Sequence, residues 1–417
     1  MGKENRKEII NYMRILHISK YYYPYIGGVE NICKYLVDNM KKDNDIAVVC
    51  FNEKKDDRID IVDGVKVYRV GAKMTIARQA LSLSYFTVLK KAIREFKPDI
   101  IHFHWANPYP AFVLLTMIPK NVKLVIHWHM DIIKQKKIYP FIRPVETRLL
   151  KRASLVLVTS PNYRDGSIPL RPFRDKVRVV PNAIDEINLI PQDGDEERIA
   201  QIKKQYGSKD IVFFVGRHIQ YKGLPHLIEA EKMVKSDCVL VIAGKGPLTA
   251  ELKASCHSKR VHFVGKVSDD DLRCYLYAAK VFAFPSITKN EEFGVALAEA
   301  MYCHTPAVTF TIPGSGVNWV SINKKTGLEV PNGDDKAYAA AIDRLLQNNI
   351  LREQLADNGV RRVKGNFLIH NMINACEKAY NELNIKTMEV KFSGGGITLL
   401  TYNGKRVYAV SNQLKAA

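Results

Sequence analysis

Residues 280–299 read KVFAFPSITKNEEFGVALAE, and this stretch contains the end of one element and the start of the next. Residues 281–284 are apolar and are followed by Pro285, which indicates a buried strand that ends there. Residues 295–301 are strong helix formers, so a helix is predicted to begin at Gly294. Because backbone N–H groups at a helix start are unpaired and a glycine allows close approach, this junction suits a phosphate group.

Two carboxylates flank the same junction. Glu291 lies in the loop before the predicted helix, and Glu299 lies about two turns further along the chain. From these positions the two acids can reach different hydroxyl groups of one ligand. An ordinary amphipathic helix with a solvated glutamate at each end has the same pattern, so other parts of the chain must distinguish the two interpretations.

The alternation of apolar, strand-like runs with helix-like segments extends through the whole chain. The predicted strands are 15–18, 46–51, 100–103, 124–127, 155–159 and 177–180 in the first half, and 211–215, 239–243, 261–264, 281–284 and 307–310 in the second. This pattern predicts an α/β protein in which two Rossmann-like domains with parallel sheets face each other across a cleft. Neither half has a Gly-x-Gly-x-x-Gly motif after its first strand, which argues against a nicotinamide cofactor.

The length of 417 residues suits two domains of ordinary size. We predict an N-terminal domain over residues 1–188 and a second domain over 189–365, since an acidic linker and helix begin near Asp193. A helix over 366–384 is predicted to close the second domain and cross back to the first. Residues 385–417 alternate in polarity around Gly394 and Asn403-Gly404, as an appended tail with a hairpin does.

The formal net charge of +20 is concentrated in the first half, where residues 1–185 contain 33 basic and 18 acidic side chains. Either a nucleic acid or an anionic membrane surface explains this excess. Basic and apolar residues alternate in segments 74–97 and 134–152, as an interfacial face requires, although a helix with an apolar core side and a solvated basic side has the same pattern.

No apolar run is long enough to span a membrane. Seven cysteines without metal-ligand spacing suit a reducing cytoplasm. We expect a cytoplasmic protein that is peripheral on the inner face of the plasma membrane.

Two further loops carry groups that suit phosphate. The first predicted strand leads into Gly27 and Gly28 at a helix start, where backbone amides can approach a ligand phosphate, although a plain turn has the same sequence. The first strand of the second half is followed by Arg217 and Lys222. These two charges can bind a diphosphate and neutralise the charge that it gains on departure, whereas an isolated pair of this kind is more often solvated.

In this order, the motifs resemble those of the family 4 glycosyltransferases, which are retaining enzymes with the two-domain GT-B fold. The resemblance covers nearly all of residues 13–384 and rests on Gly27-Gly28 with Glu30, His102-Phe103-His104, Gly216-Arg217 with Lys222-Gly223, residues 243–247, residues 263–265 and residues 291–299. Local similarity in residues 127–136 and 160–163 indicates the subgroup that builds bacterial surface polysaccharides, including lipopolysaccharide O-antigen. Glu292 departs from the pattern, because glycine is usual at that position.

The resemblance implies a donor site in the second domain. Arg217 and Lys222 would hold the donor diphosphate, Glu291 would bind hydroxyl groups of the donor sugar, and Glu299 would bind the nucleotide ribose. The backbone of Phe293, Gly294 and Val295 would complete these contacts, and residues 313–319 are predicted to line the sugar end.

The first domain would supply Gly27 and Gly28, with Gly28 approaching the diphosphate from the opposite side of the cleft. His129 matches the histidine that the family places near the reacting sugar, with His127 as the competing choice. At least one of His102 and His104 is expected to be only a packed core histidine.

The implied enzyme is a hexosyltransferase that moves a hexose or N-acetylhexosamine from a UDP-sugar or GDP-sugar to a lipid-diphosphate-linked oligosaccharide. The family pattern offers no obvious nucleophile, so we favour front-face attack, with the departing phosphate taking the proton of the acceptor. We expect no cofactor and no metal, because the Asp-x-Asp pairs at 43–45, 193–195 and 269–271 fall in polar loops or at helix starts. The alternatives are a sugar-nucleotide epimerase of the same fold and a basic nucleic-acid-binding protein, although no nucleic-acid module is recognisable.

Overall fold

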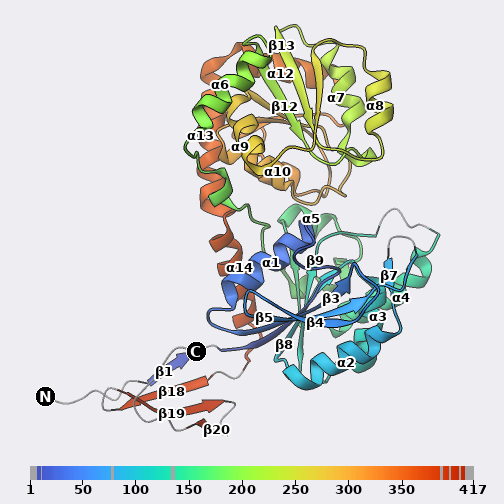
Figure 1. The fold of residues 1–417 in the computed structure, drawn as a ribbon, viewed down its shortest axis with the longest axis vertical. Helices are drawn as coiled ribbons and strands as arrows, with labels where there is room; N and C mark the ends of the chain where they lie inside the picture. Colours follow the sequence, from blue (N-terminus) through green and yellow to red (C-terminus); the bar gives the residue numbers. More distant parts are fainter. Residues whose placement is uncertain are drawn as a thin grey trace, which may run out of the picture. The chain divides into compact units, whose positions relative to one another are not determined.

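The structure is a computed structural model that describes residues 7–10, 12–76, 79–132, 137–385, 388–393, 396–402 and 405–408. The chain divides into two compact units, each built on a parallel sheet with helices on both faces (Figure 1). Unit 1 consists of Met1–Trp128, Gln135–Leu157 and Cys376–Ala417, and unit 2 of His129–Lys134 and Val158–Ala375. The predicted α/β class with two Rossmann-like sheets is confirmed.

The sheet at the centre of unit 1 has eight strands in the order β11-β10-β9-β8-β2-β3-β5-β4, and its edge strand β11 comes from the segment that is assigned to unit 2. They are β2 (Arg14–Ile18), β3 (Asp45–Asn52), β4 (Arg58–Val62), β5 (Val65–Gly71), β8 (Ile100–Trp105), β9 (Lys123–Trp128), β10 (Leu155–Val158) and β11 (Val177–Val179). Strands β9, β8, β2, β3 and β5 run parallel, whereas β4 pairs antiparallel with β5. The β4–β5 hairpin was not predicted, although Asp63-Gly64 at its turn is a typical hairpin signal.

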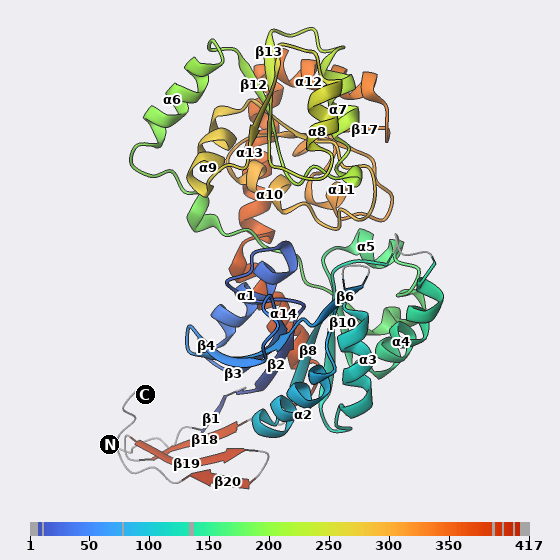
Figure 2. The ribbon, with the colours of Figure 1, turned by 45° about the vertical axis from the view of Figure 1, so that its right-hand side comes forward.

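Helices cover both faces of this sheet (Figure 2). On one side lie α1 (Gly28–Met40) and α14 (Ile369–Asn381), and on the other α2 (Ser84–Phe96), α3 (Pro108–Met117) and α4 (Tyr139–Arg152). Helix α14 begins in unit 2 and passes into unit 1 at Cys376, so the predicted crossing helix is present. None of the helices in the described parts of the chain combines the length and the apolar character that a bilayer crossing requires.

The tail belongs to a small antiparallel sheet of its own. Strand β18 (Met388–Ser393) pairs antiparallel with β19 (Gly396–Tyr402), and β19 pairs antiparallel with β20 (Lys405–Tyr408). The predicted turn residues Gly394 and Asn403-Gly404 lie outside the described residues. The fourth strand is β1 (Lys7–Ile10), which pairs with β18 from Lys7 opposite Lys391 to Ile10 opposite Met388. This pairing joins the two ends of the chain and has no signal in the local sequence.

The sheet of unit 2 has six parallel strands in the order β14-β13-β12-β15-β16-β17. They are β12 (Asp210–Val215), β13 (Cys238–Ala243), β14 (Val261–Gly265), β15 (Val281–Phe284), β16 (Ala307–Phe310) and β17 (Gly327–Val330). Figure 1 shows α6 (Asp195–Gln205) and α9 (Asp269–Ala278) on one face, with α7 (Leu224–Glu231) and α8 (Thr249–Ser255) on the other. Both faces are therefore covered, which is why the strands read as continuous apolar runs, with Phe213, Val241 and Phe282 fully buried.

Strand order in unit 2 fixes where a ligand can bind. The chain leaves β12 toward β13 on one side, while β15, the other neighbour of β12, continues to β16 on the opposite side. The loops that follow β12 and β15 therefore diverge, and such a switch point at the carboxyl edge of a parallel sheet is where open α/β folds bind ligands.

A close backbone contact holds these two loops together. Gly223, at the N-terminus of α7, has φ +66°, and a Cβ atom there would lie 1.9 Å from the carbonyl oxygen of Pro285, which follows β15. Only glycine satisfies both conditions at this position.

We expect Gly223→Ala to lower the free energy of unfolding by about 3 kcal/mol or more, because the methyl group adds a backbone clash to the strain of a positive φ. Gly207→Ala is the matched control, since Gly207 has the same φ of +66° with no atom within 4 Å of its Cβ position. It should cost only about 1 kcal/mol. Urea unfolding of both variants measures the difference, and equal losses would contradict the close-contact explanation.

Candidate functional site

The loops after β12 and β15 bring together the charged residues that the sequence singled out in the second half. Arg217 and Lys222 follow β12, and Glu291 and Gly294 follow β15. The ammonium Nζ of Lys222 lies 2.5 Å from Oε2 of Glu291, and both side chains are largely buried. The predicted neighbours therefore lie side by side at the switch point.

The Glu291 carboxylate is held by several groups. The hydroxyl of Ser286 donates to Oε2 of Glu291 at 3.0 Å, and the hydroxyl of Ser315 donates to the backbone carbonyl of Glu291. Burial alone would lower the pKa of Lys222, but the adjacent Glu291 carboxylate outweighs it and holds that pKa above its ordinary value. The ammonium group is therefore charged, and its position is fixed before any ligand binds.

Arg217 is different, because its exposed guanidinium has no hydrogen bond or ion pair with any residue that the structure describes. A fixed cation beside a free one suits a doubly charged anion, which needs more than one positive partner.

Gly294 caps the helix that was predicted to begin there, α10 (Val295–Tyr302). Its φ is +86°, and a Cβ atom would lie 3.0 Å from the ring of Phe284, so glycine is required for the loop to enter the helix along this path. Phe293 is buried against the ring of Phe367, with centroids 5.3 Å apart, and anchors the loop. The amides of Gly294 and Val295 lie where a helix has unpaired donors.

Two acids near this junction have raised pKa values. Burial, followed by the charges of Asp269 and Asp185, raises the pKa of Glu299 to about 7. Burial also raises the pKa of Glu292 well above its ordinary value. Only Glu291 among these three acids has a cationic partner within the described residues.

The sequence missed the residues that orient Glu291. Ser286 was interpreted only as the end of a strand, and Ser315 only as part of a segment lining the sugar end. The amide of Gly316 also donates to the carbonyl of Glu292 at 2.8 Å, so the 313–319 segment is hydrogen-bonded to the Glu291 loop. Neither contact follows from sequence spacing.

The remaining predicted residues lie in other places. Gly27 precedes α1, and Gly28 begins it with no atom within 4 Å of its Cβ position, so the helix start is open there. His129 is buried just beyond the end of β9. His127, the competing choice, lies inside the sheet of unit 1 among other imidazoles, and burial lowers its pKa to about 3.

The carboxylates of Asp195 and Asp271, from two of the Asp-x-Asp pairs, are ion-paired with Arg273 and Arg198.

Open α/β units of the Rossmann type bind nucleotides at the switch point of the sheet, and in unit 2 this point brings Lys222 and Glu291 together. Residues 26–186 match the model of the family described as Glycosyltransferase Family 4, and residues 195–362 match Glycosyl transferases group 1. The chain belongs to the glycosyltransferases that combine these two domains. The epimerase and nucleic-acid alternatives receive no support from these matches.

Relatives of known name agree in class. The chain is 28% identical over 381 residues to the "O-antigen chain mannosyltransferase C" of Escherichia coli, covering 89% of this chain and 99% of the relative. It is 29% identical over 365 residues to "D-rhamnosyltransferase WbpZ" of Pseudomonas aeruginosa, covering 85% and 92%. The solved structure of Anabaena Alr3699/HepE in complex with UDP-glucose has a TM-score of 0.70 at 17% identity, covering 89% of this chain and all of the other, and it shares the GT-B fold.

The raised pKa of Glu299 predicts a pH-dependent stability. The folded protein holds this proton more tightly than the unfolded chain does, so the free energy of unfolding should fall as the pH rises from about 4.5 to about 7. Glu299→Gln removes the titration, and this variant should be more stable than the parent by up to about 3 kcal/mol at pH 8, with no difference near pH 4.5. Urea unfolding at both pH values measures the effect.

Glu251→Gln, at an exposed glutamate of α8, is the matched control and should change nothing at either pH. A difference between Glu299→Gln and the parent that is the same at pH 4.5 and pH 8 would rule out a raised pKa as the cause.

Proposed function

We propose that this glycosyltransferase moves a hexose or N-acetylhexosamine from a UDP-sugar or GDP-sugar to a lipid-diphosphate-linked saccharide during synthesis of a bacterial surface polysaccharide. The observation that carries the proposal is the pairing of Lys222 with Glu291 beside the free guanidinium of Arg217. The name of the O-antigen chain mannosyltransferase supports a role in surface-polysaccharide synthesis, and the name of the rhamnosyltransferase supports transfer of a hexose-type sugar. The UDP-glucose complex of the Anabaena protein supports a nucleotide-sugar donor.

In this proposal the cations stabilise the leaving group. The bond between the anomeric carbon and the diphosphate breaks while negative charge grows on the phosphate oxygens. Arg217, Lys222 and the N-terminus of α10 supply positive charge there without a metal ion, so transfer should continue in EDTA. Glu299 would bind the ribose, and His129 would lie near the reacting sugar.

The surroundings of Glu291 favour a binding role for its carboxylate. Oε2 already accepts from both Lys222 and Ser286, which lowers its nucleophilicity and leaves the other oxygen to accept from a sugar hydroxyl. Retention of configuration would then follow from front-face attack of the acceptor hydroxyl, whose proton passes to the departing phosphate.

Nucleotide binding tests the donor site directly, because a ligand that binds only the folded state raises the melting temperature. We expect stabilisation by one family of nucleoside diphosphates and their sugars, unchanged by EDTA and lost in Glu299→Ala. The absence of a shift with every uridine and guanosine compound would exclude the proposed donor.

Arg217→Ala should lower kcat/KM for the donor by about 100-fold or more, the usual loss when one donor to a developing oxyanion is removed. Arg344→Ala is the matched control, because Arg344 is an exposed arginine of α12 (Asp335–Gln347) whose side chain has no hydrogen bond or ion pair with the residues that the structure describes. Initial rates with the donor identified by melting give the comparison, and equal rates for Arg217→Ala and the parent would refute the assignment.

We also propose that α4 in unit 1 binds the anionic inner face of the plasma membrane. The outer side of this helix exposes Phe141, 81% accessible, and its exposed cations are Arg143, Arg148 and Lys151. An exposed aromatic ring flanked by cations is the composition of an interfacial helix.

Phe141→Ser should weaken binding to vesicles that contain phosphatidylglycerol by roughly 30-fold, the equivalent of about 2 kcal/mol for one buried phenyl group. Ile350→Ser in unit 2, where Ile350 is 83% accessible, is the matched control and should bind as the parent does. Vesicle co-sedimentation at low and high salt measures both variants. Equal losses in the two variants would indicate nonspecific adsorption.

A further inference from the structure

Four histidines form a compact array on one face of the unit 1 sheet. His17 lies on β2, His102 and His104 on β8, and His127 on β9. In the strand register His17 is paired with His102 and His104 with His127, and alternate residues of a strand share a face. All four side chains have no accessible surface.

Hydrogen bonds run diagonally across this array. Nδ1 of His17 lies 3.2 Å from Nε2 of His104, and Nε2 of His102 lies 3.2 Å from Nδ1 of His127. Nδ1 of His102 also lies 2.5 Å from the hydroxyl of Tyr380 on α14. Both ring nitrogens of His102 are therefore engaged, whereas Nε2 of His17 has no hydrogen-bond partner among the described residues.

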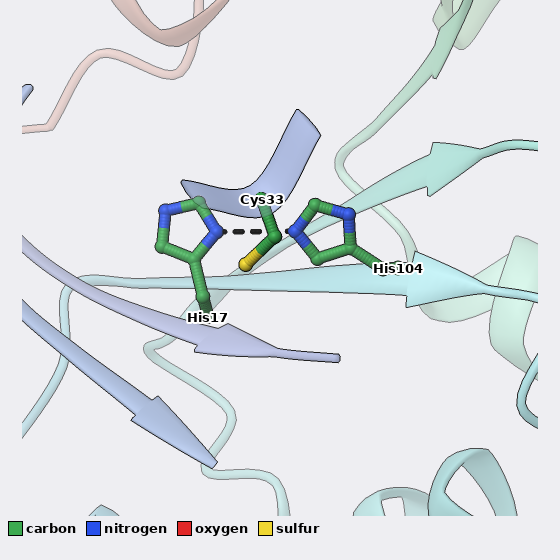
Figure 3. Close-up of side chains that lie close together, drawn as sticks. All are labelled: His17, Cys33 and His104. Carbon is green, nitrogen blue, oxygen red and sulfur yellow. Dashed lines mark hydrogen bonds between the residues drawn. The ribbon is translucent and has the colours of Figure 1, made fainter. Parts of the chain in front are cut away.

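Cys33 reaches the same place from α1, which covers this face of the sheet. Figure 3 shows its sulfur beside the hydrogen bond that joins His17 and His104. The ligand atoms of His17, Cys33 and His104 all lie within 4.8 Å of one another. The thiol is free and fully buried.

We propose that His17, Cys33 and His104 bind a zinc ion in the core of unit 1. In tetrahedral zinc sites, bond lengths place two nitrogen ligands about 3.3 Å apart and a nitrogen and a sulfur about 3.6 Å apart. The observed 3.2 Å between Nδ1 of His17 and Nε2 of His104 matches the first spacing, and the sulfur of Cys33 lies within 4.8 Å of both ligand nitrogens. This inference is independent of the proposed transfer reaction.

A second trio, His102, His104 and His127, is equally compact but less suitable. Binding at either trio would break one hydrogen bond between two histidines. Three neutral imidazoles, however, would leave both charges of the ion uncompensated in a dry interior. Cys33 contributes a thiolate charge, and thiolate with imidazole is a ligand set that zinc prefers.

Coordination requires neutral imidazoles and a deprotonated thiol. Coordination forms a zinc–sulfur bond and releases the thiol proton to solvent.

The ion would join α1 to β2 and β8, and α1 is the helix whose N-terminus carries Gly28. Its role is structural, because all three ligands lie beneath the helix and none has accessible surface. A chelator would reach such a site only on unfolding, so EDTA-resistant transfer and bound zinc are compatible.

The test is the metal content of the full-length protein, expressed in zinc-supplemented medium and washed with EDTA. Mass spectrometry of the metals should give about one zinc per chain, the stoichiometry of a single bound ion. Cys33→Ser and His17→Asn should lose it. Cys50→Ala, at another fully buried cysteine of unit 1, should retain it. A parent without zinc, or Cys33→Ser with as much zinc as the parent, would overturn the proposal.

Cobalt substitution keeps the test decisive if the variants fold poorly. The parent expressed with Co²⁺ should show a thiolate-to-cobalt charge-transfer absorption. This absorption requires a cysteine ligand, and it can be measured on the parent protein alone. Cys50→Ala should show the same band. Bound cobalt without that absorption would exclude Cys33 as a ligand.

Discussion

The backbone contact between Gly223 and Pro285 is the constraint on which the donor site depends. It holds the loop after β12 against the loop after β15, and only a glycine at φ +66° permits it. Lys222 then lies 2.5 Å from Glu291, and the cost of burying both charges is offset by their attraction and by the hydroxyl of Ser286. A cation fixed in this way needs no reorganisation when a phosphate arrives, and that is the form in which electrostatic stabilisation is most effective.

The same constraint explains why the proposed donor-site residues gather at one edge of unit 2. Six parallel strands end at that edge, but only β12 and β15 are neighbours whose loops diverge. Arg217 and Lys222 come from one loop, and Glu291 and Gly294 from the other, so each loop supplies part of a site that neither forms alone. The rest of the sheet contributes burial, which fixes the register of these two strands.

The sequence predicted the strands that are buried on both faces, because a short, continuous apolar run such as 281–284 is typical of a buried strand. It missed the charged β4–β5 hairpin, the short edge strand β17 and the pairing of β1 with β18, whose partners lie at opposite ends of the chain. The charged site residues were predicted because they directly follow buried strands. Ser286 and Ser315 were not assigned roles, and His17, Cys33 and His104 were not grouped, because only strand register and helix packing bring such residues together.

The proposed anion site contains three acidic residues, and the negative charge of each is reduced by its surroundings. Glu291 is neutralised by Lys222, and burial raises the pKa values of Glu292 and Glu299 so that their repulsion of a diphosphate is reduced. Glu299 is the most responsive of the three, because its pKa of about 7 lets hydroxyl donors from a ribose favour the carboxylate. The raised pKa of Glu292 reduces the negative charge that this buried side chain would place beside the proposed phosphate position.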